Sequence, residues 1–222
     1  MKNDYKLIIN MKTYSECMDK KAIKLAKICH DLRNQAKKLN VEIILCPQTL
    51  DLKDVVRTKV TTFAQHIEIC SPGAHTGWPI ADNFKSCGAK GTLISHSEHI
   101  LDTISVKKRI LLAKKLGFIS CVCARDIKTA KKIAKYNPDF IAVEPAELIG
   151  GDISISTSNP KLISDSVKAC GSVPLLVGAG VKNSSDVRIA VGLGAVGILV
   201  ASGVVKAKNQ KKVILDLLSG FE

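Results

Sequence analysis

The chain of 222 residues is 46% hydrophobic and 24% charged, which is typical of a water-soluble globular protein and suits either one α/β barrel or two small domains. Its net charge of +13 comes from 33 Lys and Arg against 20 Asp and Glu, and it predicts an attractive field for small anions such as phosphate esters. The basic residues are spread over many segments and only 4% of the residues are aromatic, which argues against a nucleic-acid-binding protein.

Segments with the pattern of a strand alternate with segments with the pattern of a helix along the whole chain, without a linker. The predicted strands cover residues 7–9, 43–45, 61–66, 90–94, 119–123, 140–143, 173–177 and 196–200. Predicted helices cover residues 50–56, 106–115, 126–134, 186–191 and 208–218. A further long helix is predicted after Ser15, which would cap it, and its buried face would carry Met18, Ala22, Leu25, Ala26, Cys29 and Leu32.

Eight strands alternating with helices is the pattern of a (β/α)8 barrel. Alternation alone does not separate a closed barrel from an open, doubly wound sheet. Polar residues, however, follow the first, fourth, sixth, seventh and eighth predicted strands, and in a barrel the carboxyl ends of all strands share one rim. An open sheet would scatter some of these residues. We therefore expect an α/β protein in which residues 1–222 form one eight-stranded parallel barrel.

The eight cysteines lie mostly inside apolar runs, with Cys46, Cys121 and Cys123 in predicted strands and Cys29 and Cys170 in helical segments. Cys121 and Cys123 would share one strand face, a spacing that belongs to neither a redox nor a zinc motif. Core packing is the better interpretation. With no signal peptide and no apolar run of 18 residues, we expect a cytoplasmic protein and no membrane partner.

A single carboxylate, Glu144, ends the apolar strand at residues 140–143, and Pro145 prevents a helix from starting directly after it. The Gly150–Gly151 pair that follows, with several Ser and Thr residues beyond it, indicates a hinged lid over the carboxylate. This arrangement is typical of a general base. Taken alone, Glu144 is more simply interpreted as a solvated residue at a strand end, and only the rest of the chain favours the general base.

Two other polar segments follow predicted strands. Lys12 offers a permanent charge for a phosphate or an oxyanion, and Asn10, two residues earlier in an extended segment, offers amide hydrogen bonds. His96 follows the fourth strand and opens a polar turn with Ser97 and Glu98. If a helical turn begins there, its amides favour a neutral imidazole that donates a hydrogen bond. The alternatives are a surface lysine, a turn asparagine and a structural histidine.

Small residues follow the last two strands, in Gly178-Ala179-Gly180 and Ala201-Ser202-Gly203. They allow backbone N–H groups to approach an anion closely, and phosphate sites recur after strands seven and eight of such barrels. No Walker loop is present, and no Cys/His cluster has the spacing of a metal site. We expect neither a metal nor a cofactor.

In order and strand position, Asn10-x-Lys12, Ser95-His96-Ser97-Glu98, Ala142-Val-Glu144-Pro145, Gly178-Ala-Gly180 and Ala201-Ser-Gly203 resemble the triosephosphate isomerase family over residues 10 to 208. The short length resembles its compact archaeal branch. The chain departs from the family pattern at Met11, at the His99-Ile100 pair and in the lid, which has no Trp.

The resemblance implies a TIM barrel that interconverts dihydroxyacetone phosphate and glyceraldehyde 3-phosphate through an enediolate, in glycolysis and gluconeogenesis. Glu144 would be the base, His96 the electrophile, Lys12 the stabilising charge and Asn10 a ligand of the substrate oxygen. Glu98, paired with Lys12, and Ser97 would support them. Residues near the phosphate would be Ile149, Gly151, Gly178, Ala179, Gly180, Ala201, Ser202 and Gly203.

The segment Gly73-Ala-His-Thr76-Gly77 resembles the third loop of the family, in which Thr76 would reach the active site of a neighbouring subunit. The resemblance implies a homotetramer, or at least a dimer. Two rival hypotheses remain open: another phosphate-binding barrel, which would share the glycine turns without needing Lys12, His96 and Glu144 together, and a basic protein that binds RNA.

Overall fold

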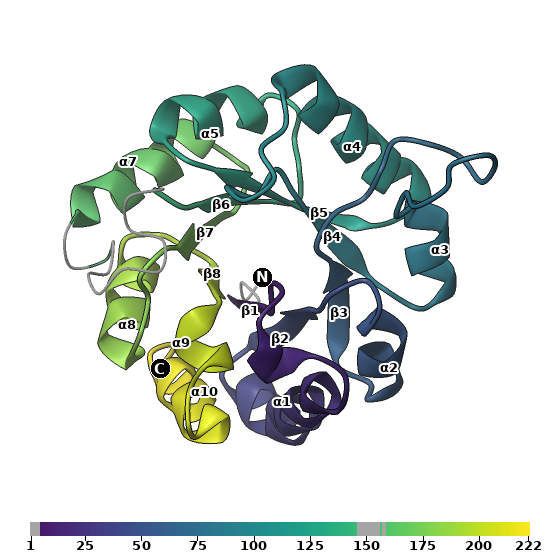
Figure 1. Cartoon of the computed structure of the whole chain (residues 1–222). Coiled ribbons are helices and arrows are strands. Elements are labelled where there is room, and N and C mark those ends of the chain that lie inside the picture. The colour runs from purple at the N-terminus through teal and green to yellow at the C-terminus, as the bar shows by residue number, and fades with distance from the viewer. Residues whose placement is uncertain (1–4, 146–155, 157–158) are drawn as a thin grey trace.

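The computed structural model of the chain describes residues 5–145, 156 and 159–222. Eight parallel strands form a closed barrel in the order β1 to β8, and helices surround it (Figure 1). The strands are β1 (Tyr5–Asn10), β2 (Val41–Cys46), β3 (Thr61–Ala64), β4 (Gly91–Ile94), β5 (Ile119–Ala124), β6 (Phe140–Val143), β7 (Leu175–Gly178) and β8 (Gly197–Val200). The predicted (β/α)8 architecture is confirmed.

The surrounding helices each follow a strand and return the chain to the opposite end of the barrel or cap its rim. They are α1 (Lys20–Lys38), α2 (Leu52–Arg57), α3 (Ala81–Ser86), α4 (Thr103–Leu116), α5 (Ile127–Ala134), α7 (Pro160–Cys170), α8 (Ser184–Gly192), α9 (Ser202–Val205) and α10 (Gln210–Ser219). One 3-10 turn, η1, spans Ser15–Cys17. None of the helices in the described part of the chain is both long and apolar enough to cross a bilayer.

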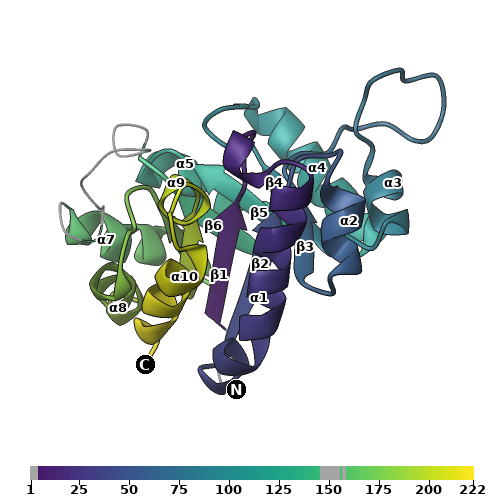
Figure 2. The same ribbon diagram turned by 60° about the horizontal axis from the view of Figure 1, so that its bottom comes forward.

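Pairing of the first strand with the last excludes the open sheet. Residue Lys6 of β1 pairs with Gly197 of β8, and the ladder continues to Ile9 and Val200. All strands are parallel, so the segments after their carboxyl ends lie together at one end of the barrel, the upper end in Figure 2. The polar residues predicted at strand ends therefore share one rim.

Apolar side chains fill both the barrel interior and the layer between strands and helices. The interior cluster includes Ile8, Ile44, Cys46, Phe63, Leu93, Cys121, Cys123, Ala142, Leu176 and Leu199. Cys121 and Cys123 thus point to the same side of β5, as their spacing predicts. The outer layer packs the opposite strand faces against helices, for example Leu25 and Cys29 of α1 in one continuous cluster with Ile9 and Ile198.

The long first helix begins later than the sequence predicts. Ser15 does not cap it but opens the 3-10 turn, and α1 begins at Lys20 after Asp19, which has a φ of 51° and no side-chain cap hydrogen bond. Met18 was expected on the buried face, but 39% of its surface is exposed because it precedes the helix. The helical spacing of apolar residues extends through the 3-10 turn, so the sequence alone did not separate the turn from the helix.

Other boundaries also differ. Strand β3 ends at Ala64 rather than at residue 66, and two short helices, α3 and α9, were not predicted. No range was predicted for α7 either, although Cys170 was placed in a helical segment. With 6 and 4 residues, α3 and α9 are too short for a helical period to show in the sequence. The positions of the remaining predicted strands are correct to within about two residues.

The cysteines provide a direct test of this core. Six of them are buried, and only Cys70 and Cys87 are partly accessible. Burial raises the pKa of Cys17 to about 11 and that of Cys29 to about 12, so these thiols stay protonated and poorly nucleophilic at neutral pH.

We expect a thiol reagent at neutral pH to modify two cysteines of the native protein rapidly and all eight in denaturant. Mass spectrometry of peptides would assign the fast sites to Cys70 and Cys87. The substitutions Cys70→Ser and Cys87→Ser together should abolish the fast phase. Rapid labelling of Cys121 or Cys123 in the native protein would contradict the core described above.

Candidate active site

The first loop holds Lys12 through a short turn. Lys12 has a φ of 46°, in the left-handed region that non-glycine residues seldom occupy. Asn10, the last residue of β1 and 4% exposed, accepts a hydrogen bond from the Lys12 N–H through its Oδ1 at 3.0 Å. The sequence predicted an extended segment here, and that prediction is wrong. The Asn10 side chain stabilises the strained turn that the structure has instead.

Gln65 stabilises this turn from the other side, and its role was not predicted from the sequence. Its Nε2 donates to the carbonyl oxygens of Lys12 and Cys46, each at 2.9 Å, and lies 3.4 Å from Asn10 Oδ1. A single amide thus joins the ends of β1, β2 and β3. The contact spans 53 positions between Gln65 and Lys12, so no local pattern could reveal it.

A chain of polar contacts connects Lys12 with His96. Lys12 Nζ lies 2.7 Å from Glu98 Oε1, and Glu98 Oε2 lies 3.6 Å from His96 Nδ1. The Lys12 side chain is 10% exposed whereas that of Glu98 is 58% exposed. One carboxylate at the solvent boundary therefore fixes the direction of the ammonium and lies beside the imidazole.

The backbone defines the protonation of His96. The Glu98 N–H donates to His96 Nδ1 at 3.2 Å, within a tight turn closed by a 2.8 Å bond from the His99 N–H to the His96 carbonyl. A nitrogen that accepts a hydrogen bond carries no proton, so the ring is neutral with its proton on Nε2. The expected turn after His96 is present and presents Nε2–H as a donor.

His96 and Glu144 face each other across the barrel mouth. Glu144 directly follows β6, is 4% exposed, and its Oε2 lies 3.7 Å from His96 Nε2. Neither atom has a hydrogen-bond partner among the described residues, although both are buried. Buried polar atoms without partners are rare and costly, so this pair marks a place where another molecule would supply the missing hydrogen bonds.

Gly178 makes room for the Glu144 side chain. A Cβ at Gly178 would lie 2.5 Å from Glu144 Cγ and 2.8 Å from its Oε1. No side chain can approach that closely. From the sequence, Gly178 was expected to allow close approach of an anion. Its steric role beside Glu144 arises because β6 and β7 are adjacent strands, and it was not predicted.

The two predicted glycine turns both lie on the same rim. Ala179 and Gly180 follow β7 with φ values of 71° and 74°, which turn the backbone sharply. Ala201 precedes α9, and Ser202 and Gly203 are its first residues, where backbone N–H groups have no partner within the helix. Ile149 and Gly151 lie outside the described residues, as does most of the predicted lid.

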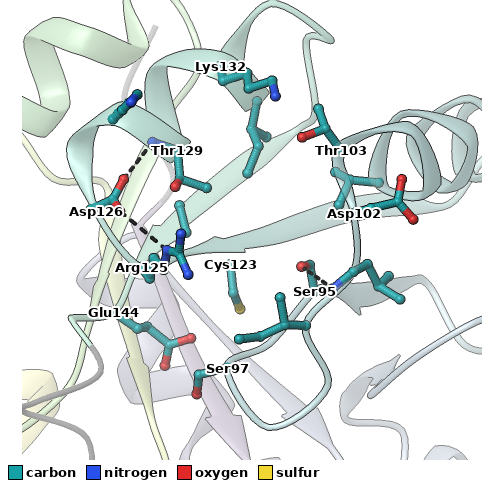
Figure 3. Close-up of a pocket in the computed structure, with 16 residues that line it drawn as sticks. Ser95, Ser97, Asp102, Thr103, Cys123, Arg125, Asp126, Thr129, Lys132 and Glu144 are labelled. Atoms are coloured by element: carbon teal, nitrogen blue, oxygen red, sulfur yellow. Dashed lines mark hydrogen bonds and ion pairs between the residues drawn. The ribbon is translucent and has the colours of Figure 1, made fainter.

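A cavity of about 330 Å³ extends from Glu144 and Ser97 toward α4 and α5. In Figure 3 the Ser97 side chain lies beside the Glu144 carboxylate, and Cys123 lies farther in. Burial, together with the Glu144 carboxylate beside it, raises the pKa of the Cys123 thiol well above its usual value. The thiol is therefore neutral and adds no second charge near Glu144.

A second group of side chains supports the His96 turn from behind. The His99 ring stacks on His66 with centroids 4.2 Å apart, and Glu68 lies 3.2 Å from His66 and 2.6 Å from the Arg109 guanidinium. Burial lowers the pKa of His66 despite the nearby Glu68, which favours the neutral ring. His66 and His99 therefore pack against the back of the turn.

Thr76 is not part of this cluster. It is exposed in the loop between β3 and α3, which projects from the barrel in both views (Figures 1 and 2). In the same loop the exposed Trp78 ring stacks on His75 at 5.5 Å. Among the described residues, no three His, Cys, Asp or Glu side chains gather closely enough to hold a metal ion.

These contacts define a (β/α)8-barrel protein whose polar site combines an ammonium, a neutral imidazole and a buried carboxylate on the rim formed by the strand ends. Comparison with known proteins narrows this class. A family model described as triosephosphate isomerase matches residues 6–218. The chain therefore belongs to the triosephosphate isomerase family.

Curated relatives agree with this assignment over almost their full length. The chain is 40% identical to a triosephosphate isomerase of Methanocaldococcus jannaschii, with 96% of this chain and 98% of the relative covered. It is 38% identical to one of Methanobrevibacter smithii, with coverage of 96% and 97%. For a relative of the same name from Archaeoglobus fulgidus the identity is 39%, with 96% of both chains covered.

The steric role of Gly178 can be tested by a single methyl group. Gly178→Ala should push the Glu144 side chain away from His96, and a misplacement of about 1 Å lowers kcat roughly 100-fold. Gly192→Ala in α8 is the matched control, because no atom lies within 4 Å of its new Cβ. A crystal structure of the Gly178→Ala variant should show the longer separation; an unchanged distance with unchanged kcat would disprove this role.

Proposed function

We propose that the chain is a triose-phosphate isomerase that interconverts dihydroxyacetone phosphate and D-glyceraldehyde 3-phosphate through an enediolate. The observation that carries this proposal is the pair of buried, unpartnered atoms, His96 Nε2 and Glu144 Oε2, 3.7 Å apart. A proton donor beside a proton acceptor fits a substrate that has a carbonyl oxygen next to an acidic C–H bond.

Proton transfer would begin at Glu144. Its carboxylate takes a proton from the carbon next to the carbonyl, and the electron pair moves to the carbonyl oxygen. His96 Nε2–H donates a hydrogen bond to that oxygen as its charge grows. Glu144 then returns the proton to the neighbouring carbon. His96 Nε2 gives its proton to the former carbonyl oxygen and takes up the proton of the hydroxyl oxygen that becomes the new carbonyl, which completes the isomerisation. Triosephosphate isomerases in general pair a glutamate base with a neutral histidine, and the 3.2 Å bond to His96 Nδ1 supports a neutral ring here.

Lys12 and Asn10 would stabilise the substrate. The Lys12 ammonium adds a positive charge where the enediolate oxygen becomes negative, and the low exposure of its side chain, 10%, strengthens that attraction. Asn10 would hold a substrate oxygen while its Oδ1 also orients Lys12. Glu98 and Ser97 would position the reacting groups without contacting the substrate. Glu98 would orient the Lys12 ammonium, and Ser97 lies beside the Glu144 carboxylate.

The substrate phosphate would bind to backbone N–H groups of the last two turns and of the lid. The residues are Ile149, Gly151, Gly178, Ala179, Gly180, Ala201, Ser202 and Gly203. Support comes from the positive φ values at Ala179 and Gly180 and from the free amides at the start of α9. A lid would also exclude water, which limits loss of phosphate from the enediolate.

The site requires no cofactor in this scheme, because the substrate carbonyl itself acidifies the adjacent C–H bond. The activity belongs to glycolysis and gluconeogenesis, and we propose that residues 1–222 act as one barrel domain in the cytoplasm. Another phosphate-binding barrel remains the competing function, but it gives no reason for the unpartnered imidazole and carboxylate to face each other.

The assignment of the base is tested in a coupled isomerase assay. Glu144→Ala and the isosteric Glu144→Gln should both lower kcat by several decades, because no other described carboxylate lies within reach of His96 Nε2. Glu42→Gln, at the opposite end of the barrel, is the matched control and should retain kcat. Normal turnover in Glu144→Gln would exclude Glu144 as the base.

We further propose a homo-oligomer, a tetramer with dimers as its unit, in which Thr76 reaches the site of a neighbouring chain. The projecting loop and its exposed Trp78 support this, since large exposed aromatic side chains are typical of interfaces. Light scattering should then give at least twice the 23.9 kDa of one chain.

The substitution Thr76→Arg should lower both that mass and kcat, because a bulky charge at the loop tip would prevent docking. Ser86→Arg on α3, exposed but outside the loop, should change neither. A fully active monomer would rule out a role for Thr76 in a neighbouring site.

A further inference from the structure

A lysine-lined cavity lies on the outer side of the barrel, between α1, η1 and the segment from α9 to α10. Its volume is about 390 Å³, within the range of small-molecule sites. Both views show α10 packed beside α1 with α9 above them (Figures 1 and 2). The lining includes the apolar side chains of Ile28, Val205 and Ala207, and its other residues are polar or charged.

The charge of this cavity is strongly one-sided. Five lysines line it against a single carboxylate, Glu16; the lysines are Lys21, Lys24, Lys206, Lys208 and Lys211. Glu16 lies at the surface, and its pKa is lowered by hydrogen bonds to the backbone and Ser15, with smaller contributions from Lys206 and Lys21. The cavity therefore carries an excess of four positive charges.

Most of these ammonium groups have no anionic partner. Lys21 Nζ donates to the Ser15 carbonyl at 3.0 Å, and Lys206 Nζ lies 4.5 Å from the centre of the Tyr14 ring. For Lys24, Lys208 and Lys211 no ion pair is formed with any described residue. Like charges held around one cavity repel one another, and an anion between them would remove that repulsion.

The two helices add to the same positive potential. α1 begins with Lys20 and Lys21, and α10 begins with Gln210, Lys211 and Lys212. Neither helix has an acidic residue in its first turn, where the positive end of the helix dipole normally favours Asp or Glu. The N-cap residue of α1 is Asp19, which supplies one negative charge there, whereas that of α10 is the uncharged Asn209. The N-terminus of α10 therefore brings Lys211 and Lys212 to a position where positive charge is unfavourable without a compensating anion.

We propose that this cavity is a binding site for a compact anion with several negative charges, of the pyrophosphate or sugar-bisphosphate type. None of the residues that line it is aromatic, so it offers no surface on which nucleic-acid bases could stack. Its small volume and concentrated charge suit a small polyphosphate. The site is separate from the barrel mouth, because it includes neither Lys12 nor Glu144.

The walls of the cavity nevertheless continue into the proposed active site. Glu16 follows Lys12 by four positions, and Lys206 follows Gly203 by three. An anion bound there would lower the positive potential that attracts the phosphorylated substrate. Occupancy should therefore raise the KM for the triose phosphate more than it changes kcat.

The direct test measures inorganic pyrophosphate binding to the full-length protein by calorimetry. With the proposed phosphate site of the barrel mouth saturated by a phosphoglycolate-type inhibitor, we expect one pyrophosphate site per chain. The triple variant Lys24→Gln, Lys208→Gln, Lys211→Gln should bind at least about tenfold more weakly, because three attractive charges are lost. The matched control, Lys85→Gln, Lys114→Gln, Lys115→Gln, removes the same charge from α3 and α4 and should change the affinity less than about twofold.

Thermal unfolding provides a second measurement that does not depend on isomerase activity. In the presence of the same inhibitor, pyrophosphate should raise the Tm of the native chain and of the control, but not that of the cavity variant. Without anion, the cavity variant should be at least as stable as the native chain, since it loses unfavourable charges. Equal weakening in both triple variants, or no binding to the native chain, would overturn the proposal, even if Glu144→Gln abolishes isomerase activity as expected.

Discussion

Closure of the barrel by β1 against β8 is the constraint on which the site depends. Lys12, His96 and Glu144 are far apart in sequence and share one rim only because the ladder from Lys6–Gly197 to Ile9–Val200 joins the two ends of the sheet. Lys12 and its partner Glu98 are 86 positions apart. An open sheet would leave the first and last strands at opposite edges, and the first loop would then lie far from the turn after β8.

Within that frame, the site combines satisfied and unsatisfied polar groups. Three side chains hold the loop around Lys12: Asn10 accepts from its N–H, Gln65 donates to its carbonyl oxygen and Glu98 pairs with its ammonium group. The ammonium is therefore fixed before any ligand arrives. His96 Nε2 and Glu144 Oε2 are left without partners. Rigid surroundings with two open hydrogen-bonding positions are what preorganised acid–base chemistry requires, because the substrate then completes the network rather than reorganising it.

The sequence was sufficient for features that depend on local periodicity. Apolar runs predicted all eight strands, and the strand ends brought Asn10, His96 and Glu144 to one rim. It failed where tertiary contacts decide the outcome. Gln65 gave no signal within the predicted strand at residues 61–66, because its acceptors lie on other strands. Ser15 resembled a helix cap because the apolar spacing ran through η1. The lysine cavity was also missed, since its charges come from both ends of the chain.

Gly178 shows that the Glu144 carboxylate is positioned by empty volume as well as by bonds. The space that its missing Cβ leaves is filled by Glu144 Cγ. Grafting only the lysine, histidine and glutamate onto an unrelated eight-stranded scaffold would therefore reproduce the functional groups without the hollow that accommodates one of them. A designer would have to transfer a residue with no side chain from the adjacent strand, which an inventory of reactive groups would never include.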